Sequence, residues 1–128
     1  MDREKLELIG KQIVDVAHQV HKELGPGLLE SAYERCMMFE FIDRGFHVER
    51  QKKLPIVYKG NLIEGGYRLD LIVEKEIIIE LKTVDHILPV HEAQLISYLK
   101  LSGKKLGYLI NFNVDLIKNG IYRRVNKL

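Results

Sequence analysis

Asp70, Glu80 and Lys82 are the residues of this chain whose types and spacing are best suited to chemistry. Glu80 and Lys82 follow the apolar run 77–79, and because they are two residues apart they point to the same face of a predicted strand. Asp70 lies in the preceding apolar segment, 68–73. Charged groups in such strands cost several kcal/mol each to desolvate unless they are paired or bind a metal. These three residues therefore predict a functional site.

The turn between the two segments decides whether Asp70 and Glu80 can act together. A three-residue turn centred on Lys75 pairs positions whose numbers sum to 150, which places Asp70 opposite Glu80 with both side chains on one face. A two-residue turn would place them on opposite faces, because a slip of one residue reverses every side chain. We therefore predict the odd-length turn, or a bulge with the same effect.

Two neighbouring carboxylates repel one another unless a cation lies between them. Oxygen ligands with room for water suit Mg²⁺ or Mn²⁺ better than zinc. A lysine beside them, here Lys82, can hold or deprotonate a bound water or stabilise charge on a transferring phosphate. The bare Glu-x-Lys spacing arises easily by chance, so its position on an apolar strand carries the inference.

Two predicted helices add polar residues to this set. In the helix predicted over 91–101, His91, Gln94 and Tyr98 share one face, and the Gln94/Tyr98 pair suits contact with a substrate backbone or orientation of a ligand. The alternative is a glutamine on the helix flank and a tyrosine that caps the core. Glu30 and Tyr33 share a face near the start of the second helix, where a glutamate also fits the helix dipole.

The pattern along the chain predicts the elements that position these residues. The 128 residues form one predicted domain, 1–128, and the expected order is αα-βββ-α-ββ. This order favours an α/β (α+β) class with a mixed central β-sheet flanked by helices. Helices are expected over 6–24, 28–44 and 91–101, and strands over 47–58, 62–74, 77–83, 106–112 and 120–125. Pro55 indicates an edge or a bulge in the first strand, and Gly65-Gly66 predicts a bulge or bend that interrupts the second.

Composition narrows the function classes. The net charge of +2 does not by itself indicate nucleic acid, although basic residues gather near 50–53 and in the last quarter of the chain. The single cysteine, Cys36, fits a reducing cytoplasm, and no stretch is apolar enough to span a membrane. No phosphate-cradling glycine loop or Ser-His-Asp order is present. His18 and His21 lack the partners of a metal site.

With these residues assembled, the sequence resembles the GxxExxY family, a branch of the PD-(D/E)XK nuclease superfamily. The family's name-giving motif is present as Gly27-x-x-Glu30-x-x-Tyr33. The remaining pattern is present as Arg68-x-Asp70, Glu80-x-Lys82, His91-Glu92-Ala93-Gln94-Leu95-x-x-Tyr98-Leu99 and Gly107-x-Leu109-Ile110-Asn111-Phe112. The Gln94/Tyr98 pair and the helical Glu30 are also similar to the RecB-type exonuclease branch.

The resemblance implies a restriction-endonuclease-like fold and Mg²⁺- or Mn²⁺-dependent hydrolysis of DNA phosphodiester bonds by an activated water. It implies that Asp70 and Glu80 bind the metal, with the Leu81 carbonyl and Glu30 as further ligands. Lys82 would act on the attacking water, and Gln94 would orient the site. The substrate-binding residues expected from the same pattern are Tyr98, Tyr33, Arg68 and His91.

Two alternatives remain open from the sequence. A nuclease fold can persist as a non-catalytic module that binds nucleic acid or a protein through the same groove and the basic C-terminal segment. Lys82 could also pair directly with Glu80 or Asp70 in a structural ion network, which contacts of about 2.7–3.0 Å would reveal. A homodimer would double the surface available to DNA, so that oligomeric state is also considered.

Overall fold

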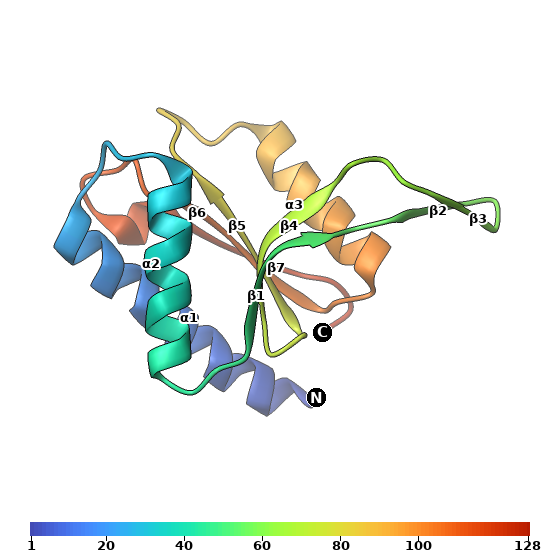
Figure 1. The fold of residues 1–128 in the computed structure, drawn as a ribbon, viewed down its shortest axis with the longest axis horizontal. Coiled ribbons are helices and arrows are strands. Elements are labelled where there is room, and N and C mark those ends of the chain that lie inside the picture. The colour runs from blue at the N-terminus through green and yellow to red at the C-terminus, as the bar shows by residue number, and fades with distance from the viewer.

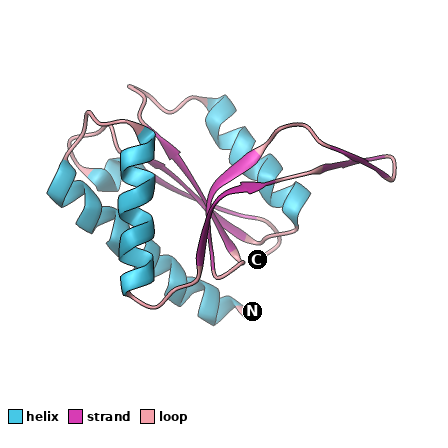
Figure 2. Ribbon diagram, in the orientation of Figure 1, coloured by secondary structure: helices cyan, strands magenta, loops and turns pink.

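The computed structural model describes all 128 residues as a mixed sheet with helices on both faces (Figures 1 and 2). The helices are α1 (Arg3–Leu24), α2 (Glu30–Asp43) and α3 (Pro89–Ser102), with a short 3₁₀ helix, η1 (Ile117–Gly120). The strands are β1 (Val48–Lys53), β2 (Ile56–Tyr58), β3 (Asn61–Ile63), β4 (Arg68–Val73), β5 (Ile77–Lys82), β6 (Leu106–Asn111) and β7 (Ile121–Val125).

The main sheet has the order β1-β4-β5-β6-β7. Only β5 and β6 are parallel, and α3 provides the crossover between them; every other neighbouring pair is antiparallel. This arrangement confirms the predicted α/β class and the mixed central sheet flanked by helices. It is a restriction-endonuclease-like architecture.

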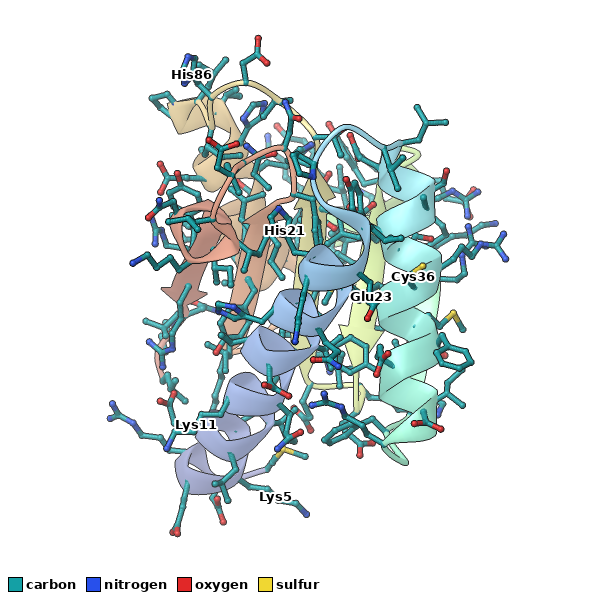
Figure 3. The ribbon with its side chains drawn as sticks, turned by 90° about the vertical axis from the view of Figure 1, so that its left-hand side faces the viewer. Lys5, Lys11, His21, Glu23, Cys36 and His86 are labelled. Atoms are coloured by element: carbon teal, nitrogen blue, oxygen red, sulfur yellow. The ribbon has the colours of Figure 1, made fainter.

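The two faces of the sheet have separate cores. A cluster of 20 buried residues joins the apolar stripe of α1 and the inner face of α2 to one side of the sheet. A smaller cluster of 8 residues packs α3 against the other side. Figure 3 shows α1 and α2 side by side on the larger core, with Cys36 on α2. The His21 ring on α1 contacts the Val114 carbonyl at 2.8 Å, so this histidine has a structural partner.

The segments predicted as the strands 47–58 and 62–74 each divide into two separate strands. The interruption expected at Gly65-Gly66 is present, but the prediction that each segment forms one strand is wrong. β1 ends at Lys53, ahead of Pro55, which has no N–H for a sheet ladder. The second break falls at 64–67, where Gly66 has a φ of +76°. As a result β2 and β3 leave the main sheet and form a two-stranded arm that projects from the body (Figure 1).

The predicted register of the next hairpin is confirmed. β4 pairs with β5 through Leu71↔Ile79, Ile72↔Ile78 and Val73↔Ile77, all in the register that sums to 150. The turn between the strands has three residues, 74–76. Asp70 and Glu80 are therefore the next opposed positions along these two strands.

The contact between α1 and β6 yields a test of the fold. A Cβ added at Gly10 would overlap the Tyr108 hydroxyl oxygen, so Gly10→Ala should destabilise the protein by about 1–3 kcal/mol despite alanine's higher helix propensity. In a Tyr108→Phe background the nearest remaining ring atom is 3.3 Å away, and the same change should cost much less. Urea denaturation of the four variants measures this coupling. Equal costs in both backgrounds would contradict the packing described.

Candidate active site

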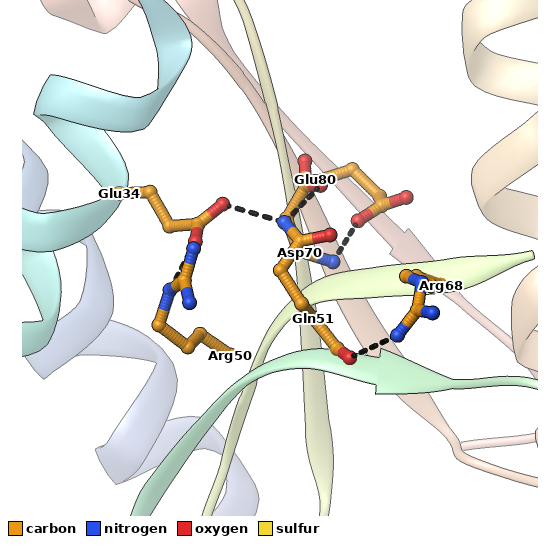
Figure 4. A network of polar contacts seen from close by, with 6 residues as sticks. All are labelled: Glu34, Arg50, Gln51, Arg68, Asp70 and Glu80. Atoms are coloured by element: carbon orange, nitrogen blue, oxygen red, sulfur yellow. Dashed lines mark hydrogen bonds and ion pairs between the residues drawn. The ribbon is translucent and has the colours of Figure 1, made fainter.

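Asp70 and Glu80 replace the backbone ladder between β4 and β5 with contacts made by their carboxylates. The regular pairing stops at Leu71↔Ile79. At the next position the Asp70 N–H donates to Glu80 Oε2 at 2.8 Å, and the Leu81 N–H donates to Asp70 Oδ2 at 2.8 Å. Each carboxylate therefore accepts a backbone hydrogen bond from the opposite strand, and the two acidic groups are held beside one another (Figure 4).

Gln51 lies beside Asp70 on β1, the second strand that neighbours β4. The register of β1 with β4 places Gln51 opposite Asp70, yet the pairing skips this position. Gln51 has a φ of +52°, a left-handed backbone that costs an ordinary L residue about 1–2 kcal/mol. Its amide donates to Glu34 Oε2 at 2.8 Å and lies 3.5 Å from Asp70 Oδ1. Such local strain is characteristic of functional sites.

Glu34 adds a buried carboxylate from α2, one turn after Glu30. It accepts a hydrogen bond from Arg50 Nε at 2.8 Å, so its charge is neutralised by an ion pair (Figure 4). Sequence reasoning missed both Glu34 and Gln51. The four-residue spacing from Glu30 could have indicated Glu34, but Gln51 becomes recognisable only once the register of β1 is known.

Burial dominates the electrostatics of the acidic pair. Glu80 is only 5% exposed. This burial, together with the negative charge of the neighbouring Asp70 carboxylate, raises the pKa of Glu80 to about 9. Burial likewise raises the pKa of Asp70 above its usual value, although the hydrogen bond from the Leu81 N–H opposes the shift. The pair is thus an acidic centre with too little positive charge around it.

Lys82 supplies positive charge to this centre without pairing with it. Its ammonium group opposes the upward pKa shifts of Glu80, Asp70 and Glu30, which places all four residues in one electrostatic neighbourhood. No ion pair joins Lys82 to any carboxylate. The alternative of a structural ion network with direct contacts is therefore wrong.

Glu30 belongs to the same neighbourhood from the side of α2. Partial burial raises its pKa above the usual range, and the nearby Asp70 and Glu34 carboxylates add to the shift. Its carboxylate is more exposed than that of Glu80. Glu30 is therefore accessible to a ligand that binds beside the acidic pair.

The donor set suits a hard divalent cation that keeps part of its water shell. Glu30, Asp70 and Glu80 offer carboxylate oxygens, and no ion pair involves Asp70 or Glu80. No three acidic, histidine or cysteine side chains converge closely enough to form a complete metal cage. Mg²⁺ commonly binds to one or two carboxylates, with water and phosphate oxygens completing its coordination. The residues present therefore fit such an ion.

Helix α3 brings Tyr98 and Gln94 to this centre. Burial raises the pKa of the Tyr98 hydroxyl, as do the nearby carboxylates of Glu80 and Asp70, and the neighbouring Gln94 side chain opposes this shift. Both members of the predicted helical pair thus lie at the acidic site. Tyr98 is also part of the smaller core, as the alternative interpretation of a tyrosine that caps the core expects. Its contact with a substrate stays a prediction.

The three other predicted substrate-binding residues have different surroundings. Tyr33 is fully buried: its hydroxyl donates to the Gly25 carbonyl at 2.6 Å and accepts from the Leu28 N–H at 3.2 Å. It therefore fastens the turn before α2, which places Glu30, and direct contact with substrate is not supported. His91 Nδ1 accepts from the Leu88 N–H at 3.0 Å and caps the start of α3. Arg68 is exposed, with Nη1 3.5 Å from the Gln51 carbonyl oxygen.

Asn111 fixes the chain that leaves the site after Lys82. It lies opposite Lys82 in the parallel pair β5–β6 and is buried. Its side-chain amide donates to the Val84 carbonyl at 2.8 Å and its oxygen accepts from the Val84 N–H at 3.1 Å. The chain just after β5 is therefore held against β6.

The family model described as PD-(D/E)XK nuclease superfamily matches residues 7–125. The chain belongs to this superfamily. Its nucleases generally use divalent metal ions, and membership supports a nuclease that acts on nucleic acid. No curated protein and no solved structure matches the chain significantly.

The finer assignments to the GxxExxY family and the RecB-type branch stay predictions, as do the homodimer and the cytoplasmic location. None of the helices is long and apolar enough to cross a membrane.

The raised pKa of Glu80 predicts how stability depends on pH without metal. The folded protein keeps a proton up to about pH 9 that an unfolded chain releases near 4.5, so stability in EDTA should fall as pH rises between these values. The slope should reach up to about 1.4 kcal/mol per pH unit. Glu80→Gln should flatten it, while Glu64→Gln on the arm should not. Urea denaturation from pH 5 to 9 measures this, and a steep slope retained in Glu80→Gln would contradict it.

The backbone of Gln51 offers a second test. Gln51→Ala and Gln51→Gly both remove the amide that bridges Glu34 and Asp70, but only glycine adopts the left-handed conformation freely. We expect Gln51→Gly to be more stable than Gln51→Ala by about 1 kcal/mol in urea denaturation. Equal stability would show that the left-handed conformation does not persist.

Proposed function

We propose that this protein is a Mg²⁺- or Mn²⁺-dependent nuclease that hydrolyses phosphodiester bonds of DNA. The observation that carries this proposal is the pair of carboxylates at Asp70 and Glu80, held side by side by each other's strands and left without a neutralising partner. A structural role would be met more cheaply by apolar residues at these positions. Membership of the nuclease superfamily supports the same chemistry.

In this proposal Asp70 and Glu80 hold the ion, and Glu30 and the Leu81 carbonyl are further ligands. The ion, when bound, would polarise the phosphate and lower the pKa of a water molecule. The two backbone hydrogen bonds fix where the carboxylates point, which is the part of a metal site that this chain must supply itself.

Lys82 is proposed to act on the attacking water or on the charge that develops at the phosphate. Its ammonium group is free of ion pairs, so it stays available to a substrate. Tyr98 and Gln94 line the same centre from α3 and would orient the substrate backbone. Tyr33 is given a positioning role for Glu30 through the turn that its hydroxyl fastens.

Calorimetric titration with Mg²⁺ and Mn²⁺ at moderate salt tests the metal site. Asp70→Asn and Glu80→Gln keep the size of the side chains and should each lower affinity at least tenfold, and both should abolish cleavage of DNA. Asp43→Asn, at the exposed end of α2, removes the same charge away from the site and should bind and cleave as the wild type does. Circular dichroism checks that each variant is folded.

Two results would contradict the proposal. Wild-type rates of cleavage in both site variants would show that the site is assigned wrongly. Salt-sensitive binding of DNA by the wild type, with no dependence on divalent ions and no cleavage, would instead favour the non-catalytic binding module.

A further inference from the structure

A cleft of about 300 Å³ lies at the root of the arm, outside the acidic centre. Its walls come from the end of β1, from β3 and from the segment that leads back into β4. The residues that matter to its chemistry are Lys53, Leu62, Glu64, Gly65, Tyr67 and Arg68. Of the residues given a functional role above, only Arg68, a predicted substrate-binding residue, lines this cleft.

The cleft adjoins the acidic centre through two of its walls. Arg68 precedes Asp70 by two residues on β4. The Tyr67 ring meets the Tyr98 ring edge to face, with centroids 5.9 Å apart and an interplanar angle of 62°. Tyr98 in turn lies within the electrostatic reach of Glu80. A polymer bound at the carboxylates would therefore have its neighbouring unit beside the cleft.

The composition of the cleft suits an aromatic group that carries negative charge. Lys53 and Arg68 provide two cations against the single carboxylate of Glu64. Tyr67 is 44% exposed and Leu62 adds an apolar surface. Stacking of a base on an aromatic ring, with cations at the phosphate, is the usual way in which proteins bind an unpaired nucleotide.

Gly65 is part of the construction of the cleft. A Cβ at this position would lie 3.0 Å from the Tyr67 ring and 3.0 Å from Ile56 Cδ1. Glycine therefore allows the ring to lie back against the chain and leaves the space beside it empty. Ordinary side chains here would push the ring into that space.

We propose that this cleft binds one unpaired nucleotide of the substrate strand, with its base against Tyr67 and its phosphate near Arg68 and Lys53. The proposal rests on the proposed nuclease function and refines it: the substrate is single-stranded nucleic acid, or a duplex with an unpaired end. A base inside a duplex has both faces covered, and freeing it costs a few kcal/mol. The cleft has room for about one such unit.

The natural chain contains no tryptophan, so Tyr67→Trp creates a single fluorescent reporter inside the cleft. The matched control is Tyr58→Trp, on β2 of the arm, where the native ring is 56% exposed and does not line the cleft. A 12-nucleotide oligo(dT) is titrated in EDTA, so that binding is measured without cleavage. We expect saturable quenching with Tyr67→Trp and little change with Tyr58→Trp, and at least tenfold weaker binding of a blunt duplex.

Affinity measurements distinguish stacking on the aromatic ring of Tyr67 from the effect of the size of its side chain. Tyr67→Phe keeps the aromatic face and should bind oligo(dT) as the wild type does, whereas Tyr67→Leu should bind about tenfold more weakly. Arg68→Ala should reduce the slope of log affinity against log salt by about 0.7, the value for one lost contact to a single strand. Arg3→Ala, at the exposed start of α1, should leave the slope unchanged.

The proposal is overturned if both tryptophan variants respond alike, if Tyr67→Leu binds as tightly as Tyr67→Phe, or if the wild type binds no oligo(dT) at low salt. Equal affinity for the blunt duplex would also overturn it. A different pair of results would reject the nuclease function and leave the cleft proposal intact. In that case oligo(dT) still quenches Tyr67→Trp in EDTA, but Asp70→Asn binds Mg²⁺ as the wild type does. Conversely, metal-dependent cleavage with no effect of Tyr67 would reject the cleft and leave the nuclease intact.

Discussion

The reciprocal contact between Asp70 and the Glu80–Leu81 segment is the constraint on which the site depends. The regular pairing of β4 and β5 stops at this point, and the carboxylate on each strand accepts a hydrogen bond from a backbone N–H of the other strand. The hydrogen bonds fix the two carboxyl groups, but no cationic side chain pairs with them, and burial raises the pKa of both, so that without metal Glu80 keeps a proton at neutral pH. A bound cation would take the place of that proton, and the unpaired ammonium group of Lys82 beside it suits phosphate chemistry.

The surrounding elements hold this contact in place from three directions. Tyr33 fastens the turn that places Glu30 at the start of α2, and Glu34 reaches from the next turn of that helix to Arg50 and Gln51 on β1. On the far side Asn111 clamps the chain just after Lys82. Burial of apolar side chains on both faces of the sheet provides the rigidity that such a site requires.

The sequence predicted the site through periodicity and register. Alternation places Glu80 and Lys82 two residues apart on one strand, and the odd-length turn at 74–76 brings Asp70 opposite Glu80, as predicted. The same reasoning located both irregularities, an edge or bulge at Pro55 and a bulge or bend at Gly65-Gly66. It did not predict that the strands end there and that the chain between them leaves the main sheet as the arm. Gln51 and Glu34 were not predicted as site residues because their roles come from contacts between segments that are distant in the sequence. Tyr33 was predicted to bind substrate because its spacing does not reveal that its hydroxyl donates to the Gly25 carbonyl inside the protein.

Anomalous diffraction from crystals of the full chain soaked in Mn²⁺ tests the central claim most directly. A single peak about 2.1 Å from carboxylate oxygens of both Asp70 and Glu80 is expected, with the Lys82 ammonium group nearby and not bonded to either carboxylate. Absence of a peak at saturating Mn²⁺, with Lys82 instead paired to the two carboxylates, would contradict the account, since the acidic pair would then need no metal to balance its charge.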